Sequence, residues 1–160
     1  MQKQSIPLIF NKYDTWNELP AEDLSLLQAA KKALETSYSP YSKFKVGAAA
    51  RLKNDEIVSG SNMENAAYPL CICAEQAVLA AASSKFPGVP VVAIAVTVKN
   101  SSQMIAEPAA PCGACRQVIC ETEQRYREKI KVIVAGEEGA VYVFESGKSL
   151  LPLAFDGSFL

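Results

Sequence analysis

The sequence predicts an α/β protein: a three-layer α/β/α sandwich with helices on both faces of a five-stranded mixed sheet. Segments with apolar residues every three or four positions alternate with segments of period two. Residues 91–98 and 130–135 are almost entirely apolar, as expected for strands that are buried on both faces. Only residues 136–139 join the last two predicted strands, which is too short for a crossover helix, so these strands should be antiparallel.

The first predicted helix spans residues 20–37. Pro20 suits a first helical position, and Leu24 and Leu27 begin a series of apolar residues at helical spacing. Residues 1–19 are the least regular part of the chain. No linker or internal repeat divides the sequence, so we expect one domain, 1–160, with residues 1–19 as an extension on its core.

After this helix the apolar period changes to two at Phe44, and a polar turn then separates two runs of this kind. This pattern predicts a β-hairpin. The predicted elements that follow the first helix are strands at 44–52 and 57–61, a helix at 73–84, a strand at 91–98, a helix at 112–127, strands at 130–135 and 140–145, and a short helix that Ser146 can cap.

Composition narrows the possible functions. The chain has 160 residues, of which 49% are hydrophobic and 21% charged, as in ordinary globular domains. Sixteen basic against seventeen acidic residues give a net charge of −1, which offers no support for nucleic acid as a partner. No segment resembles a membrane span or a signal peptide, so the expected location is the cytoplasm. There, the five cysteines are better candidates for metal ligands or free thiols than for disulfides.

The sequence contains no histidine. This absence excludes a Ser-His-Asp triad, a Cys-His dyad and every zinc site that needs an imidazole. A metal site must therefore use cysteine and carboxylate ligands. A general acid or base must be Glu, Asp, Lys, Tyr or Cys.

Cysteine spacing is the strongest functional signal. Cys112 and Cys115 form a C-x-x-C pair at the start of one predicted helix, and Cys73 opens another. The pair alone is compatible with a redox site, half a zinc ribbon or chance. Helix N-termini stabilise thiolates, however, and three thiolates with an open fourth position are typical of catalytic zinc. Cys71 is an alternative fourth ligand, which would close the site and make it structural.

Glu75 lies two residues after Cys73, in the first turn of the same predicted helix. A carboxylate beside activated water can take its proton and deliver it elsewhere. The alternative role is a common one: an acidic side chain that complements the positive end of a helix dipole. The neighbouring cysteines favour the catalytic interpretation.

Five segments together resemble the cytidine deaminase family over residues 38–155. The Cys-Ala-Glu and Pro-Cys-Gly-Ala-Cys-Arg-Gln sequences are similar to the zinc motifs of that family. The five segments are 39–48, 62–69, 73–75, 111–117 and 150–155. The all-cysteine ligand set resembles the homotetrameric branch rather than the dimeric branch, which has a histidine ligand.

The resemblance implies a cytidine deaminase-like fold and one Zn²⁺ per subunit, held by Cys73, Cys112 and Cys115. It implies a hydrolase of pyrimidine salvage that converts cytidine and deoxycytidine to uridine and deoxyuridine plus ammonia. Glu75 would be the catalytic proton carrier. The protein would bind a small nucleoside and other copies of the same chain in a homotetramer. Neither nucleic acid nor a membrane would be a partner.

The resemblance also implies a set of substrate-binding residues. In their implied roles, Asn62 and Glu64 hold the ribose hydroxyls, and Phe44 packs against the base. The Ala74 N–H contacts the base, the Ala110 carbonyl accepts from the leaving amino group, and Tyr68 and Phe155 reach a neighbouring subunit's site. The full set is Phe44, Asn62, Glu64, Ala66, Tyr68, Ala74, Ala110 and Phe155.

The chain departs from the family pattern at three positions. Gln76 stands where the family has an arginine that neutralises the thiolates, and Arg116 is a possible substitute. Ala110 stands where serine is common, and Cys71 replaces a usual glycine. Two other functions remain open at this point: a deaminase that acts on a base within nucleic acid, and a zinc-stabilised binding domain without activity. The sequence does not show whether the preferred substrate is cytidine, deoxycytidine or a related nucleoside antibiotic.

Overall fold

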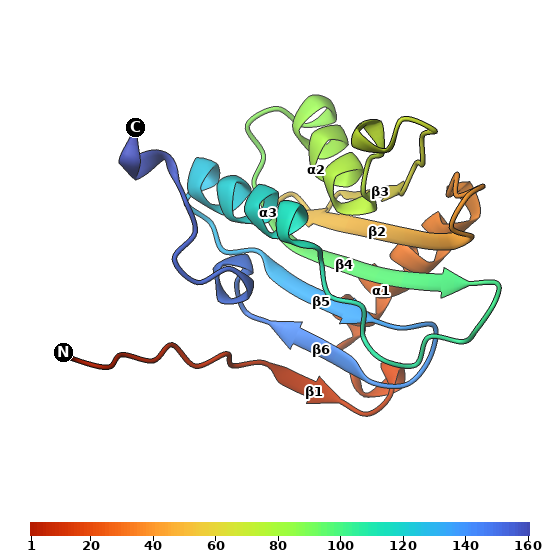
Figure 1. The fold of residues 1–160 in the computed structure, drawn as a ribbon, viewed down its shortest axis with the longest axis horizontal. Coiled ribbons are helices and arrows are strands. Elements are labelled where there is room, and N and C mark those ends of the chain that lie inside the picture. The colour runs from red at the N-terminus through yellow and green to blue at the C-terminus, as the bar shows by residue number, and fades with distance from the viewer.

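The computed structural model describes residues 1–160, which form a six-stranded mixed sheet and three α-helices (Figure 1). The elements in chain order are β1 (Asn11–Tyr13), α1 (Ala21–Ala33), β2 (Phe44–Leu52), β3 (Ile57–Ser61), α2 (Ala74–Lys85), β4 (Val91–Asn100), α3 (Gly113–Tyr126), β5 (Lys131–Ala135) and β6 (Val141–Phe144). The strand order is β1-β6-β5-β4-β2-β3.

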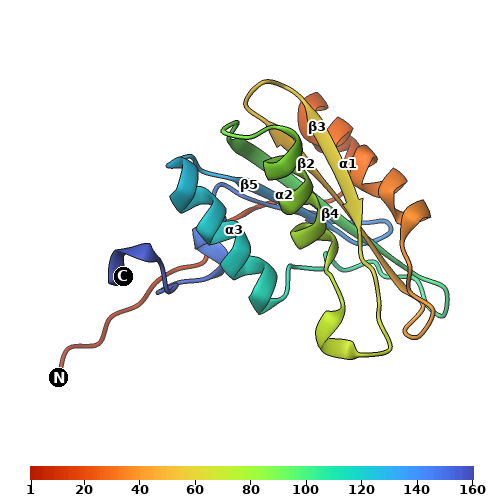
Figure 2. The same ribbon diagram turned by 90° about the horizontal axis from the view of Figure 1, so that it is seen from above.

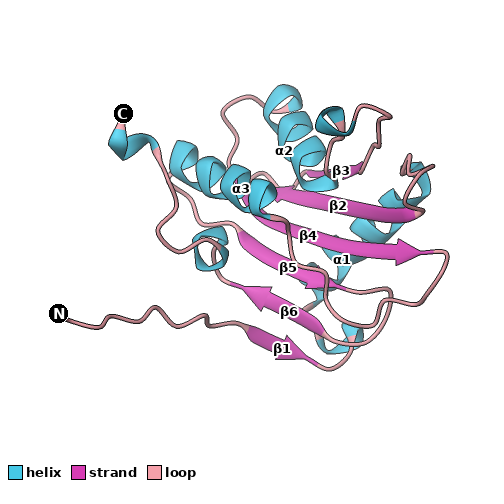
Figure 3. Ribbon diagram, in the orientation of Figure 1, coloured by secondary structure: helices cyan, strands magenta, loops and turns pink.

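The sheet is mixed because β4 and β5 are parallel and every other neighbouring pair is antiparallel (Figure 3). The antiparallel pairing of β5 with β6 confirms the prediction for the last two strands. The sequence predicts five strands, one fewer than the six in the structure. The additional strand, β1, pairs with β6 through Asn11 opposite Val143 and has only three residues, too few to display a period of two.

The helices form layers on both sides of the sheet, as predicted: α1 covers one face, and α2 and α3 cover the other (Figure 2). On the α1 face, Leu26 and Leu27 belong to one buried cluster with Ile133 of β5. On the opposite face, Val78 of α2 and Ile119 of α3 belong to a second cluster. A central sheet covered twice explains why the β4 and β5 segments are apolar at nearly every position.

A glycine in β2 allows α1 to lie close to the sheet. A Cβ atom built on Gly47 would lie 2.1 Å from the carbonyl oxygen of Ala30, so no other residue fits there without moving the helix. Ala49, two residues on and on the same face of β2, is fully buried and also small. Small side chains in β2 therefore fix the distance between the sheet and α1.

The helix boundaries agree with the predicted ones to within a few residues. The first helix is shorter than predicted, because α1 ends at Ala33 and a 3₁₀ turn, Leu34–Thr36, follows. Pro20 is the N-cap of α1 rather than its first helical residue. Ser146 caps a 3₁₀ helix, Gly147–Leu150, as predicted: its side chain accepts a hydrogen bond from the backbone N–H of Lys148. None of the helices is both long enough and apolar enough to cross a bilayer.

Candidate active site

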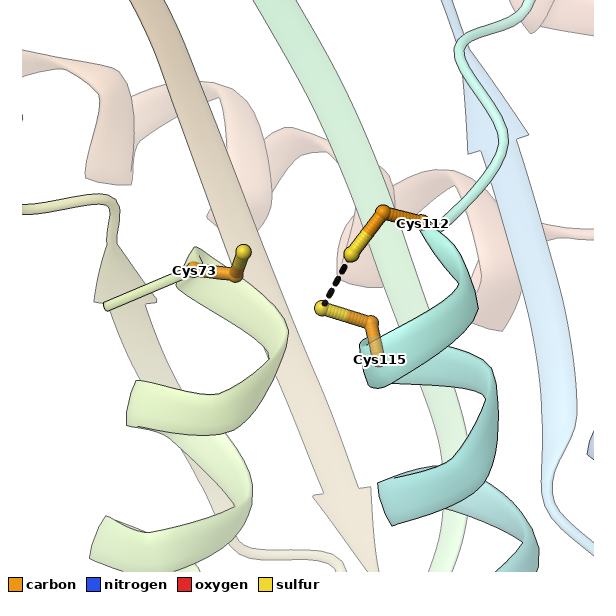
Figure 4. Close-up of side chains that lie close together, drawn as sticks. All are labelled: Cys73, Cys112 and Cys115. Atoms are coloured by element: carbon orange, nitrogen blue, oxygen red, sulfur yellow. Dashed lines mark hydrogen bonds between the residues drawn. The ribbon is translucent and has the colours of Figure 1, made fainter. Parts of the chain in front are cut away.

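The starts of α2 and α3 lie next to each other and bring three cysteines together (Figure 4). Cys73 is the N-cap of α2, Cys112 is the N-cap of α3, and Cys115 lies in the first turn of α3. Their sulfur atoms all lie within 4.8 Å of one another, and those of Cys112 and Cys115 are 3.6 Å apart. Cys115 is buried, whereas Cys112 is exposed and Cys73 half-buried.

These spacings fit tetrahedral zinc. A Zn–S bond of about 2.3 Å places two sulfur ligands of a tetrahedron about 3.8 Å apart. The separation of 3.6 Å between the Cys112 and Cys115 sulfur atoms is close to that value, and no pair of the three is farther apart than 4.8 Å. Cys71 does not belong to the group, and its sulfur instead accepts the backbone N–H of Asn65 at 3.2 Å. The protein thus offers three thiol ligands and leaves a fourth position open, which argues against a closed structural site.

Hydrogen bonding among the cysteines prepares a thiolate. The Cys115 thiol donates to the sulfur of Cys73 and lowers the pKa of Cys73 to about 7, against the opposing effects of burial and of the Glu75 charge. The same hydrogen bond, together with burial, raises the pKa of Cys115. A divalent cation favours thiolates, so metal binding would release the remaining protons.

Glu75 is one of the few buried charged side chains, with 5% of its surface exposed. It projects from the first turn of α2 into the same cavity as Cys73 and Cys112. Burial raises the pKa of the Glu75 carboxyl, because the charged form loses hydration. A raised pKa suits a group that must both take up and release a proton near neutral pH.

The side chains on either side of the zinc motifs have separate roles. The side-chain amide of Gln76 lies 3.9 Å from the sulfur of Cys115 and donates to it. Arg116 instead donates to the carbonyl oxygens of Pro111, at 2.8 Å, and Leu150, at 3.0 Å. The Arg116 guanidinium therefore holds two backbone segments and does not contact the cysteine sulfur atoms. The side chain that donates to the cluster, Gln76, carries no positive charge.

A cavity of about 470 Å³ opens over this cluster. Its volume lies in the range typical of small-molecule sites. Seven of the residues predicted for the site line it. They are Phe44, Asn62, Glu64, Cys73, Glu75, Ala110 and Cys112.

Asn62 at the strand side of the cavity is already hydrogen-bonded to the protein. Its side-chain oxygen accepts from the backbone N–H of Val46 at 2.8 Å and from the Ser37 hydroxyl at 2.6 Å. Its amide nitrogen donates to the Phe44 carbonyl at 3.0 Å. Both acceptor sites of the oxygen are occupied, so one N–H of Asn62 remains for a ligand.

Glu64 is held in a similar way by the segment that precedes β2. It accepts the backbone N–H of Tyr41 at 2.8 Å, the backbone N–H of Ser42, and the Ser42 hydroxyl. These hydrogen bonds, chiefly that of the Ser42 hydroxyl, hold the pKa of the Glu64 carboxyl below its ordinary value. Glu64 therefore presents an oriented carboxylate at the cavity wall.

The other predicted residues do not line this chain's own cavity. Tyr68 is 73% exposed, and Phe155 is 59% exposed with its ring stacked on that of Phe159. Ala66 is exposed, and the Ala74 side chain is buried in the α2 core. The backbone N–H of Ala74 nevertheless lies in the first helical turn, where N–H groups have no partner within the helix.

Sequence reasoning missed most of the apolar cavity wall. The missed lining residues are Ser42, Val46, Met63, Ile72, Val96, Val98 and Ala109; Cys71, considered above only as a zinc ligand, also lines the cavity. A signal existed for the strand residues, because Val46 shares the sheet face of Phe44 through the period of two. Val98 is the cross-strand partner of Val46, so pairing of β2 with β4 was also needed to place it.

The comparisons with known proteins agree with this geometry. Residues 20–131 match the family model described as the cytidine and deoxycytidylate deaminase zinc-binding region. The chain belongs to the cytidine and deoxycytidylate deaminase family. The family is zinc-binding, and the three-cysteine cluster provides the donor set for one such ion in this family member.

Relatives of this deaminase include named enzymes. A cytidine deaminase of Halalkalibacterium halodurans is 45% identical over 96 residues, 60% of this chain and 68% of that protein. A cytidine deaminase of Mycobacterium tuberculosis is 39% identical over 104 residues, 64% of this chain and 74% of that protein. The crystal structure of cytidine deaminase from Burkholderia pseudomallei is 42% identical and superimposes with a TM-score of 0.71, covering 82% of this chain and 97% of that one.

Proposed function

We propose that this family member catalyses the hydrolytic deamination of cytidine and deoxycytidine, giving uridine and deoxyuridine plus ammonia, as a step of pyrimidine salvage. The observation that carries the proposal is the position of buried Glu75 beside three clustered cysteines at the base of an apolar cavity. Hydrolysis at an amino-substituted ring carbon needs activated water, a proton carrier and an apolar slot for the base. The cavity supplies residues for each requirement.

Cys73, Cys112 and Cys115 would hold the zinc ion. Zinc with three protein ligands and an open position lowers the pKa of water and so makes it a nucleophile at neutral pH. Glu75 takes a proton from the attacking water and passes it to the ring nitrogen N3. A C4–O bond forms, and Glu75 then takes the remaining proton of the new hydroxyl group and delivers it to the amino group. The C4–N bond breaks, the C4=O group of the product forms, and ammonia leaves.

The opposite side of the cavity would bind the nucleoside. Phe44 packs against the base, and the remaining N–H of Asn62 together with the Glu64 carboxylate holds the ribose hydroxyls. The Ala74 N–H binds the base. Ala66 belongs to the substrate-binding segment 62–69 that also contains Asn62 and Glu64. The Ala110 carbonyl accepts from the departing amino group. Because Glu64 is an acceptor and Asn62 retains a donor, a sugar hydroxyl can both donate and accept in this position.

The active enzyme is, in this proposal, a homotetramer. Tyr68 and Phe155 are large, exposed aromatic side chains outside this chain's own cavity, as expected for groups that complete a neighbour's site. The outward side of α2 carries small residues such as Ala80 and Ser83, which permit close helix approach. Sedimentation at assay concentrations should give a tetramer, and a fully active monomer would refute the proposed assembly.

An ultraviolet assay of the zinc-loaded protein on cytidine, deoxycytidine and cytosine tests the proposed reaction. Cytidine and deoxycytidine should be converted with release of one ammonia each, and cytosine should be a poor substrate because it lacks the sugar that Asn62 and Glu64 hold. Removal of zinc by a chelator should abolish conversion, and added zinc should restore it. No conversion of either nucleoside by protein with one zinc per chain would refute the proposal and favour a zinc-stabilised binding domain.

A further inference from the structure

A second cavity, of about 680 Å³, lies on the α1 face of the sheet, behind the active site. Lys45 lies between Phe44 and Val46 of β2, and Lys99 follows Val98 of β4, so the two lysines point away from the nucleoside cavity. The lining includes five lysines and one acidic residue, Glu35: the lysines are Lys31, Lys32, Lys43, Lys45 and Lys99. This surplus of four positive charges belongs to a chain whose net charge is −1.

The five lysines have no ion-pair partners. Other basic residues of the chain do: Lys12 pairs with Asp14, and Lys53 pairs with Glu128. No carboxylate oxygen lies within 4.0 Å of any of the five ammonium groups. The acidic residues around the cavity are Glu35 in its wall, Glu137 and Glu138 in a smaller cavity that Lys31 and Lys99 also line, and Glu64, whose carboxylate interacts with the charge of Lys43. Uncompensated positive charge is therefore concentrated in one concave surface.

Two of these lysines are directly opposed. Lys45 of β2 and Lys99 of β4 are cross-strand partners in the antiparallel ladder. Like charges placed directly opposite each other on neighbouring strands destabilise a sheet. Neither ammonium group has a carboxylate within 4.0 Å to offset this repulsion, and an anion bound between them would offset it.

Helix electrostatics account for only part of the cluster. Lys31 and Lys32 lie in the last turn of α1, where positive side chains complement the helix dipole. Lys31 also lies over the Trp16 ring, at 5.1 Å from its centroid. Neither effect concerns Lys43, which adopts a left-handed backbone conformation with φ of 59°, or the opposed pair Lys45 and Lys99.

We propose that this lysine cavity binds a small polyphosphate anion, at a site separate from the deamination centre. Its volume suits a small molecule, but only one of its ten lining residues is hydrophobic, so the ligand is recognised by charge. Lysine binds phosphate as a point charge. Four lysines from α1, β2 and β4, together with Lys43 just before β2, match a ligand with several phosphoryl groups. Inorganic tripolyphosphate and a nucleoside triphosphate share this chemistry.

Calorimetric titration of the zinc-loaded protein with tripolyphosphate and, in a second arm, with ATP tests the proposal. Both probes should bind, with an affinity that falls as salt is added, and orthophosphate should bind at least tenfold more weakly. The Lys45→Gln/Lys99→Gln variant should lose at least tenfold in affinity. Its control, Lys12→Gln/Lys53→Gln, removes the same charge from ion-paired positions and should bind as the unmodified protein does. Zinc content measured after each titration separates binding from chelation.

Stability measurements distinguish a ligand site from a structural cluster. Without the probe, Lys45→Gln/Lys99→Gln should unfold at the same temperature as the unmodified protein or a higher one, because the opposed charges are gone, and cytidine turnover should be unchanged. Equal loss of affinity in both double variants, or no heat of binding with either probe, would overturn the proposal. Tighter binding of ATP than of tripolyphosphate would identify a nucleotide ligand, and equal binding an inorganic one.

Discussion

The two ends of the nucleoside cavity are built differently. At the helix end, Cys73 and Cys112 are the N-caps of α2 and α3, Glu75 lies in the first turn of α2, and all three line the cavity. At the strand end, Asn62 and Glu64 are almost fully hydrogen-bonded to the protein's own backbone and hydroxyl groups. The polar atoms of the helix end remain free to bind metal and water. Most donors and acceptors of the strand end are already hydrogen-bonded within the protein.

This difference separates chemistry from binding. The side chains of Glu75 and the three cysteines make no hydrogen bond to a strand, so changing Glu75 should affect turnover and leave the structure intact. Side chains at the strand end join β2, β3 and the segment before β2, so changing them should affect both substrate affinity and stability. Preorganised binding groups lose less conformational entropy when substrate arrives.

The largest effect is expected from Cys115→Ala. Cys115 is the buried member of the cluster, and its loss leaves two thiol ligands, too few for a stable zinc site. Zinc content should fall well below one per chain, and turnover of cytidine should become undetectable. Metal analysis and the ultraviolet assay measure both.

Cys120→Ala is the matched control for that variant. Cys120 lies on the same helix, is also buried, and is outside the sulfur cluster, and burial raises the pKa of its thiol. The control should keep one zinc per chain and near-normal turnover. Loss of zinc in Cys120→Ala, or full zinc in Cys115→Ala, would contradict the three-ligand assignment.

The second effect in size is expected from Glu75→Gln. The amide keeps the shape of the side chain but cannot carry a proton, so turnover should fall by roughly 10²–10⁴-fold, the contribution typical of a positioned acid–base group. Zinc content and thermal stability should stay near those of the unmodified protein. Glu56→Gln in the exposed β2–β3 turn, which changes the same charge, should be neutral. Near-full turnover in zinc-loaded Glu75→Gln would rule out Glu75 as the proton carrier.

Much of the fold could be predicted because its elements are long and strongly periodic. The alternation in residues 44–52 and the apolar run of residues 91–98 place two central strands without tertiary information. The missed strand β1 has three residues and depends on pairing with β6, a contact between distant parts of the chain. Local pattern carries no information about such pairing.

The helix end of the site was equally predictable, because Cys73, Cys112 and Cys115 each stand at a helix start that the sequence marks. The strand end was less so. Asn62 and Glu64 were singled out by resemblance, but their hydrogen bonds to Val46 and Ser42 join positions 16 and 22 residues apart. The hydrogen bond from Arg116 to the Leu150 carbonyl, which directs the guanidinium away from the cysteines, likewise could not be predicted without the fold.

A smaller effect, shared between binding and stability, is expected from Asn62→Ala. The change removes the acceptor of the Val46 N–H and the donor to the Phe44 carbonyl, both half-buried, and a lost hydrogen bond costs about 0.5–1.5 kcal/mol. The free energy of unfolding in urea should fall by about that amount, and KM for cytidine should rise more than kcat falls. An unchanged unfolding midpoint would contradict the structural role assigned to Asn62.

The smallest effect is expected at Glu64, and it concerns a pKa. The Ser42 hydroxyl donates to the ionised carboxylate and is the main cause of its lowered pKa. Ser42→Ala removes that hydrogen bond, so the pKa of Glu64 should rise towards its ordinary value of 4.5, while Ser42→Thr should leave it low.

The lowered pKa of Glu64 also determines how the stability of the fold changes with pH. A carboxyl whose pKa is lower in the folded than in the unfolded chain stabilises the fold at pH above its unfolded pKa, and this contribution is lost as the pH falls through its folded pKa. The unmodified protein should therefore lose stability below about pH 4.5 through Glu64, and Ser42→Ala should lose less over the same interval. Nuclear magnetic resonance titration of the Glu64 carboxyl carbon measures the pKa directly. If Ser42→Ala and the unmodified protein titrate identically, the backbone N–H groups of Tyr41 and Ser42 alone set the charge of this carboxylate, and the strand end is held by backbone rather than by side chains.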